Sequence, residues 1–308
     1  MNARMALCIG CALVLGTGAA AAADGEPPAR IVSVDGALTE IVYALGAADR
    51  LVGVDTTSLY PPQTEALAKV GYKRALSAEG LLGLAPDLLL ATDDAGPPEV
   101  LEQIERAGLA VQLIPDTPTV AGLHEKIDAV ATVLGEEAAA AELRAGIDQA
   151  LAAVQADLAE AERPRVLFLL HTGSGNELAG GRDTAVDTVI RLAGGTNVLH
   201  DAFAGYKPLS AEAAVAAAPA VILVSERNLT GLGGKDALLA RPSLAGTPAA
   251  RAGRVVAMDG PLLLAFGPRL GDAVAELAQA LGTLRDASVA ADGNAARTAG
   301  ASAAATPR

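Results

Sequence analysis

Two stretches of this chain follow the same pattern, and this internal repeat constrains the fold more than any other feature. Residues 76–91 (LSAEGLLGLAPDLLLA) align without a gap with residues 209–224 (LSAEAAVAAAPAVILV). Each stretch predicts a short helix with a serine N-cap, a break at proline and then a buried strand. Upstream, residues 40–46 (EIVYALG) resemble residues 188–194 (TVIRLAG). A repeat of this kind indicates two lobes built on one plan.

Short apolar runs alternate with helical segments in both halves of the chain. Strands are predicted at residues 30–34, 50–54, 87–91 and 109–114, and again at 166–170, 221–224 and 254–257. Strands that alternate with helices predict parallel βαβ units. We therefore expect an α/β fold with two Rossmann-like lobes, each built around a central parallel sheet.

One long helix is predicted between the two halves. Residues 136–162 consist mostly of Ala, Glu, Leu and Gln and contain no proline, a composition that favours a helix. At 1.5 Å per residue this helix is about 40 Å long, the diameter of a small domain. We expect it to hold the lobes at a nearly fixed separation. The predicted units are an N-terminal lobe at residues 24–135, a linker helix at 136–163 and a C-terminal lobe at 164–286.

Both ends of the chain are predicted to lie outside the lobes. Residues 1–23 have the pattern of a secretory signal peptide, with Arg4, an apolar stretch and an Ala21-Ala22-Ala23 cleavage site. The apolar stretch is shorter than the about 20 residues that span a bilayer. The alternative is an apolar N-terminal helix of the fold. Residues 287–308 are rich in Ala, Gly, Ser and Thr without periodicity, which predicts a disordered tail.

Composition excludes several kinds of site and partner. Cys8 and Cys11 both lie in the predicted signal peptide, so the mature chain is expected to have no thiol. A net charge of −13 argues against nucleic acid as a partner. The absence of tryptophan excludes a site built from several tryptophans. Three scattered histidines fit a divalent-metal carrier poorly.

One tyrosine stands out as a candidate ligand. A long loop follows the predicted strand at residues 50–54 and leads to Gly71-Tyr72-Lys73-Arg74. Neighbouring cations favour the ionised form of a phenol, and a phenolate is a hard anionic oxygen of the kind that binds haem iron in some proteins. From these residues alone there is also a simpler interpretation, in which Tyr72 packs a loop and the two cations are solvated.

Several segments of the chain resemble one known family. Residues 71–80 (GYKRALSAEG) closely resemble the G-Y-x-R-x-L-S-x-E-G segment of haem-binding proteins that serve bacterial ABC haem importers, which are class III periplasmic substrate-binding proteins. Residues 35–41 (DGALTEI), 55–58 (DTTS) and 206–210 (YKPLS) resemble other segments of that family. The resemblance extends from about residue 31 to residue 281, and it implies a protein that is periplasmic, monomeric and not an enzyme.

The resemblance also implies roles for individual residues. Haem would be the transported ligand, held between the lobes with Tyr72 as the axial ligand of the ferric iron. Arg74 would stabilise the phenolate or pair with a propionate, and Arg227 would reach the haem from the opposite lobe. Lys207, which stands where arginine is expected, would meet a propionate.

Three further residues receive roles from the resemblance. His171, at the end of a predicted strand, is a candidate ligand for a second haem, and the alternative is a hydrogen-bonded structural histidine. Glu79 and Glu212 match each other in the repeat and resemble the two glutamates that dock such proteins onto arginines of the ABC importer permease. Each glutamate also complements the dipole of its predicted helix.

Two alternatives to haem transport remain. The same fold could carry a ferric siderophore or cobalamin. The absence of tryptophan disfavours both ligands, because their pockets commonly use aromatic side chains. An exported hydrolase is the other alternative, but the chain contains no G-x-S-x-G nucleophile motif. We therefore expect a periplasmic carrier that captures ferric haem and delivers it to a permease, without direct membrane insertion.

Overall fold

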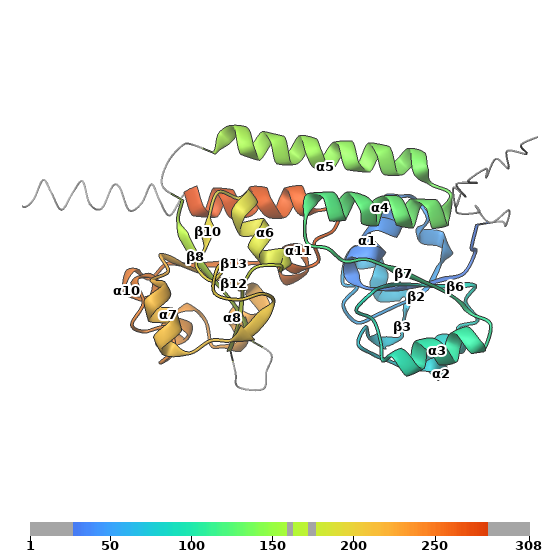
Figure 1. Ribbon diagram of the computed structural model, residues 1–308, viewed down its shortest axis with the longest axis horizontal. Helices are drawn as coiled ribbons and strands as arrows, with labels where there is room; N and C mark the ends of the chain where they lie inside the picture. The colour runs from blue at the N-terminus through green and yellow to red at the C-terminus, as the bar shows by residue number, and fades with distance from the viewer. Residues whose placement is uncertain (1–26, 159–162, 172–176, 283–308) are drawn as a thin grey trace, which may run out of the picture.

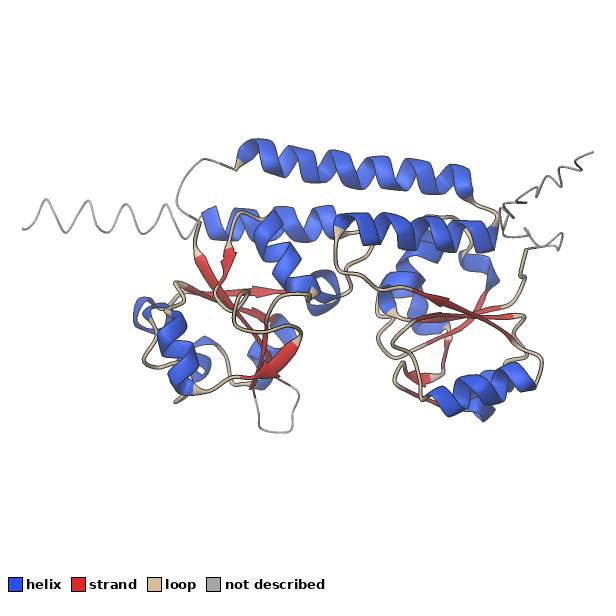
Figure 2. Cartoon of the chain, in the orientation of Figure 1, coloured by secondary structure: helices blue, strands red, loops and turns tan. Residues whose placement is uncertain are grey.

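The computed structural model of the chain describes residues 27–158, 163–171 and 177–282. The described residues form two lobes, and long helices lie along one side of both (Figures 1 and 2). The predicted signal peptide and the predicted tail, residues 1–23 and 287–308, lie outside the described residues. Within the described part, no helix combines the length and the apolar character needed to cross a membrane.

The N-terminal lobe contains a parallel sheet with the strand order β3-β2-β1-β6-β7. Its strands are β1 (Ile31–Val34), β2 (Leu51–Val54), β3 (Ala68–Lys69), β6 (Leu88–Thr92) and β7 (Ala110–Ile114). A separate antiparallel hairpin consists of β4 (Gly71–Tyr72) and β5 (Ala75–Leu76). The helices are α1 (Gly36–Ala44), α2 (Ala78–Leu82), α3 (Pro98–Arg106) and α4 (Val120–Leu134), with short 3-10 turns at Ala48–Arg50 and Pro62–Ala66.

The C-terminal lobe contains a sheet with the order β11-β9-β8-β12-β13, and β10 pairs with β8. Its strands are β8 (Arg165–His171), β9 (Glu177–Gly180), β10 (Thr196–Asn197), β11 (Tyr206–Pro208), β12 (Val221–Ser225) and β13 (Val255–Met258). The helices are α6 (Ala185–Leu192), α7 (Ala211–Ala217), α8 (Glu226–Gly231), α9 (Lys235–Leu239), α10 (Pro248–Ala252) and α11 (Gly260–Leu264). Residues 270–282 are also helical.

The predicted α/β fold is confirmed, but the C-terminal sheet is not parallel throughout. Strands β9 and β11 run antiparallel to their neighbours, whereas β8, β10, β12 and β13 are parallel. Only residues 172–176 separate β8 from β9. A parallel neighbour needs a crossover of a dozen or more residues, so β9 can pair with β8 only by turning back.

The internal repeat corresponds to equivalent positions in the two sheets. Helix α2 precedes β6, which pairs with β1 and β7, and helix α7 precedes β12, which pairs with β8 and β13. The predicted serine caps are confirmed: Ser77 accepts a hydrogen bond from the Gly80 amide at 3.4 Å and Ser210 accepts one from the Ala213 amide at 3.1 Å. Every residue of β6 and β12 is buried.

Helix α5 (Glu137–Asp157) joins the two lobes. It contains 21 residues, which corresponds to about 31 Å at 1.5 Å per residue. It lies along α4 and along residues 270–282 (Figure 1). A Cβ atom on Gly271 would come within 2.6 Å of the Ala150 Cβ, so glycine is needed where these two helices meet. The end of the predicted linker helix, residues 159–162, lies outside the described residues.

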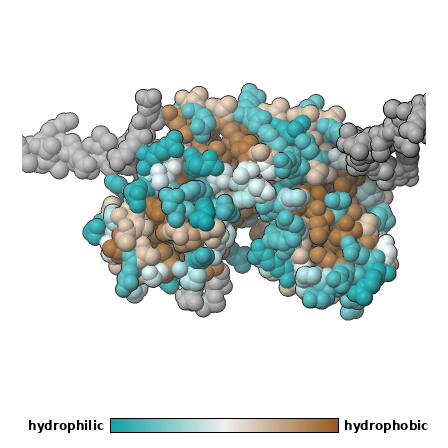
Figure 3. Space-filling model, viewed as in Figure 1, coloured by the Kyte–Doolittle hydropathy of each residue, from teal (hydrophilic) through white to brown (hydrophobic). Residues whose placement is uncertain are grey.

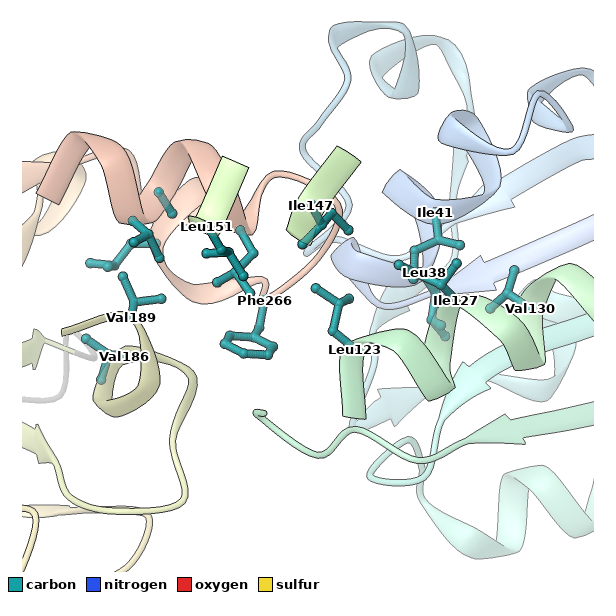
Figure 4. Packing of buried hydrophobic residues seen from close by; sticks show 14 of the residues in the cluster. Leu38, Ile41, Leu123, Ile127, Val130, Ile147, Leu151, Val186, Val189 and Phe266 are labelled. Atoms are coloured by element: carbon teal, nitrogen blue, oxygen red, sulfur yellow. The ribbon is translucent and has the colours of Figure 1, made fainter. Parts of the chain in front are cut away.

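The lobes also share one hydrophobic core, which the sequence did not indicate. A single cluster of buried side chains runs from Leu38 of α1 through Ile147 and Leu151 of α5 to Phe266 and Val189 in the C-terminal lobe (Figure 4). Each lobe has a second, separate cluster on the other face of its sheet. The lobes are therefore joined by continuous packing in addition to α5.

Candidate functional site

A cavity of about 720 Å³ lies between the lobes, and the hollow between them is visible in Figure 3. Much of its polar lining comes from the carboxyl ends of strands: Asp35 follows β1, Thr56 follows β2, Asp116 follows β7, Ser225 ends β12 and Asp259 follows β13. This edge is where open parallel sheets place their ligands. Its volume is within the range of about 300–1,000 Å³ that is typical of small-molecule sites.

The β4–β5 hairpin carries Tyr72, Lys73 and Arg74 to the edge of this cavity. The Gly71 carbonyl accepts a hydrogen bond from the amide of Thr56, a residue of the cavity wall, at 2.8 Å. Lys73 itself lines the cavity, whereas the Tyr72 side chain is 44% exposed beside it and is not part of the lining. The hairpin therefore places Tyr72 next in the chain to a residue of the cavity wall, with its own side chain exposed.

Lys73 is held by two carboxylates. Its Nζ atom lies 2.8 Å from Asp35 Oδ2 and 2.9 Å from Asp94 Oδ1, and its side chain is only 12% exposed. Burial alone would lower the pKa of Lys73, but Asp35 and Asp94 outweigh this effect and raise it. Burial raises the pKa of Asp35, against the influence of Lys73. Lys73 is therefore not the solvated cation of the simpler interpretation.

Arg74 lies between Asp94 and Tyr72. Its Nε atom donates to Asp94 Oδ2 at 3.1 Å. The hydrogen bond with Asp94 raises the pKa of Arg74, and the nearby Tyr72 hydroxyl raises it further. The positions of Tyr72 and Arg74 thus put a guanidinium beside the phenol. The sequence analysis missed Asp94, which lies two residues after the end of β6.

Asp94 makes the hairpin sensitive to acid. Burial would raise the pKa of Asp94, but hydrogen bonds from Lys73, Thr92 and Arg74 lower it from 3.8 to about 2. A carboxyl group with a lowered pKa stabilises the folded chain at pH values above its ordinary pKa. This stabilisation is lost as the pH falls from about 4 to about 2. Because the group is partly exposed, we expect Asp94→Asn to cost about 1 kcal/mol at pH 7. The loss should be smaller at pH 3, as measured by urea unfolding.

A matched control is the adjacent residue. Asp93 is exposed, and among the described residues its side chain has no hydrogen bond or ion pair. Asp93→Asn should therefore leave the free energy of unfolding unchanged at both pH values. An equal loss for both variants would show that the Lys73 and Arg74 contacts do not hold the hairpin.

Arg227 lines the cavity from the C-terminal lobe. It is the second residue of α8, which follows β12 directly and is capped by Ser225 through a 3.3 Å bond from the Asn228 amide. Its side chain is exposed, and within the described ranges it has no ion-pair partner. Arg227 therefore presents an available cation to the cavity, in contrast to Lys73.

Lys207 is not part of the cavity lining. Lys207 lies on β11, exposed, with its Nζ atom 5.6 Å from the centre of the Phe203 ring. His171 is the last residue of β8, and its neighbour Leu170 lines the cavity. The side chain of His171 and residues 172–176 lie outside what the structure describes. Its role as a second haem ligand stays a prediction.

The sequence analysis also missed a contact between the lobes. Arg269 Nε lies 2.9 Å from Glu40 Oε2, and Arg269 Nη2 lies 2.6 Å from Glu40 Oε1. The Arg269 guanidinium also stacks on Tyr60, 3.7 Å from the ring centre. Tyr60 lines the cavity and is 41% exposed. We call these three residues the Glu40–Arg269–Tyr60 clamp.

A buried lysine makes a second contact between the lobes. The side chain of Lys126 on α4 is fully buried, and its Nζ atom lies 2.5 Å from Asp116 Oδ1 and 3.4 Å from the carbonyl of Phe266. Asp116 lines the cavity. Polar groups from both lobes are thus fixed against each other behind one residue of the cavity wall.

The two repeat-matched glutamates are not part of the cavity lining. Glu79 and Glu212 are exposed in the first turns of α2 and α7. These helices belong to different lobes and lie on the side away from α5 (Figure 1). Both glutamates are therefore available to a partner that touches the two lobes at once.

Comparisons with known proteins give a consistent result. A family model described as periplasmic binding protein matches residues 31–262. The solved structure of the periplasmic heme-binding protein RhuT from Roseiflexus sp. RS-1, in apo form, is 42% identical, with a TM-score of 0.79, and the match covers 83% of this chain and 98% of that chain. The periplasmic heme-binding protein BhuT in complex with two hemes is 44% identical, with a TM-score of 0.76, covering 82% and 98%. A vitamin B12-binding protein of Vibrio cholerae is 29% identical over 203 residues, covering 66% of this chain and 72% of that protein.

Proposed function

Because this chain belongs to the periplasmic binding protein family, we propose that it captures ferric haem between its lobes and delivers it to the permease of an ABC importer. The observation that carries this proposal is the hairpin that holds Tyr72 beside Arg74 and contributes the intervening Lys73 to the cavity wall. The similarity to solved heme-binding proteins supports it along nearly their whole length. We propose no chemical conversion of the ligand.

We propose a division of roles among the cations of the site. The Tyr72 oxygen coordinates the ferric iron as a phenolate, which Arg74 stabilises by its positive charge. Asp94 orients Arg74 and, together with Asp35, neutralises Lys73. Of the two cations in the cavity lining, Lys73 and Arg227, it is Arg227 that pairs with a propionate from the opposite lobe.

The apolar part of the cavity wall would hold the porphyrin. Leu59, Leu170 and Leu264 contribute to it together with Pro261 and Ala265. Burial of a flat apolar ligand against such side chains contributes roughly 25 cal/mol per Å² of apolar area. Tyr60 adds an aromatic ring to this aliphatic wall.

Residues outside the cavity complete the proposal. We propose that residues 1–23 direct export of a monomer to the periplasm, that Glu79 and Glu212 dock it on the permease, and that Lys207 meets a propionate when the ligand is bound. His171 is proposed to bind a second haem. A second equivalent of haem should then bind to the wild-type protein and not to His171→Ala.

Cobalamin is the second candidate ligand, because vitamin B12-binding proteins are among the relatives of this chain. We expect hemin, added to the purified mature protein, to give a saturable shift in the visible spectrum with a phenolate-to-iron band. Cyanocobalamin should change neither the tyrosine fluorescence of the protein, which contains no tryptophan, nor the absorbance spectrum of the cobalamin itself. Tight cobalamin binding without a hemin-dependent spectrum would overturn the haem proposal.

A further inference from the structure

Helices α2 and α7 present the same surface. In the repeat, Glu79 matches Glu212 and Leu82 matches Val215. Leu82 is 36% exposed and Val215 is 45% exposed. Among the large hydrophobic side chains that are exposed in the described part of the chain, these are the two that occupy matched positions of the repeat.

The pattern of burial is also shared. Leu81 and its match Ala214 are buried under their helices. The exposed positions of α2 and its C-cap are Glu79, Gly80, Leu82 and Gly83, and their matches on α7, Glu212, Ala213, Val215 and Ala216, are exposed as well. The two faces differ at the first helical residue, because Ala211 is exposed whereas its match Ala78 is buried. The glutamate and the aliphatic residue are three positions apart, so they are neighbours on the helix surface. The other exposed positions are small, which allows another molecule to approach closely.

Neither helix stability nor the cavity accounts for the exposed parts of the two aliphatic side chains, although Val215 also packs against Gly246, where an added Cβ atom would lie 2.9 Å from its Cγ2 atom. The serine caps and first-turn glutamates stabilise the helices, but an exposed Leu82 or Val215 adds nothing to that effect. Neither residue lines the cavity. One exposed leucine is ordinary on a protein surface. Two exposed aliphatic side chains at equivalent positions of the two lobes, each beside a glutamate, indicate that both lobes use this surface for the same kind of contact.

We propose that Leu82 and Val215 are apolar anchors of the permease interface, one on each lobe. Each anchor inserts into an apolar recess whose neighbouring cation pairs with Glu79 or Glu212. Because the two lobes present matched pairs, the partner presents the same recess and cation twice, as two copies of one subunit do around a twofold axis. This inference rests on the proposed delivery to a permease and adds the apolar contacts of that interface.

The test compares serine variants of the two anchors with a matched control. Leu113 on β7 is 41% exposed and lies outside both helices, so Leu113→Ser removes a similar side chain from another surface. The partner is the importer, reconstituted in nanodiscs, and binding of each variant to it is measured directly. We expect Leu82→Ser and Val215→Ser each to weaken binding to it by about tenfold, and the double variant by about 100-fold. Leu113→Ser should remain within about twofold of wild type.

A hemin titration of every variant separates this inference from the proposed function. Unchanged haem affinity and an unchanged melting temperature, together with weakened docking, support the anchors. If the serine variants dock like wild type while Glu79→Ala and Glu212→Ala do not, the apolar anchors are wrong and delivery stands. If only one serine variant loses affinity, the twofold arrangement is wrong. A wild-type protein that docks but binds no hemin removes the haem proposal and leaves the interface supported.

Discussion

Replacing Tyr72 with alanine is expected to lower the affinity for ferric haem by at least about 100-fold and to abolish the phenolate-to-iron band. Loss of a residue that merely orients a metal ligand costs about 10–100-fold in affinity, so loss of the ligand itself should cost no less. The side chain is 44% exposed, and its removal opens no cavity in the core. The variant should therefore fold normally, and a hemin titration followed in the visible spectrum measures the loss directly.

The chain offers a control for the phenolic oxygen. Tyr72→Phe keeps the ring and removes the oxygen, so it should lose the band as completely as the alanine variant. Tyr60→Phe removes the hydroxyl of a tyrosine that lines the cavity but lies on Arg269. We expect it to keep the band. If Tyr72→Phe retains the wild-type spectrum and affinity, Tyr72 does not coordinate the iron.

Much of the fold could be predicted because its signals are local. Serine caps, proline breaks and buried apolar runs each depend on a few adjacent residues, and the repeat shows them twice. The antiparallel edge of the C-terminal sheet was missed for the opposite reason. Strands β9 and β11 are short, and their direction depends on which strand they pair with rather than on their own composition.

The candidate site was predictable only in part. Tyr72 and Arg74 belong to one motif, so their proximity follows from their spacing. The partners of Lys73 come from the loops after two different strands, and no local pattern indicates that Asp35 and Asp94 meet there. Glu40 and Arg269 are even farther apart in the chain. Long-range ion pairs of this kind arise from the fold and leave no periodic signal in the sequence.

Replacing Arg269 with alanine is expected to lower the free energy of unfolding by about 3–5 kcal/mol at pH 7. The Glu40 side chain is only 5% exposed, and without Arg269 its charge would be buried without a partner. The clamp would also lose its stacking contact with Tyr60. Arg144→Ala is the control, because its ion pair with Asp128 is exposed on both sides and should contribute at most about 1 kcal/mol.

The pH dependence of the Arg269 variant distinguishes a buried charge from a simple loss of packing. Burial already raises the pKa of Glu40, and Arg269 opposes that rise. Without Arg269 the pKa should rise further, so the folded chain would bind a proton that the unfolded chain releases. A raised carboxyl pKa means that stability falls as the pH increases through it. The deficit of Arg269→Ala, measured by urea unfolding, should therefore be smaller at pH 5 than at pH 7. Adding Glu40→Gln should remove this pH dependence, whereas a deficit that is equal at both pH values would show that the clamp acts by packing alone.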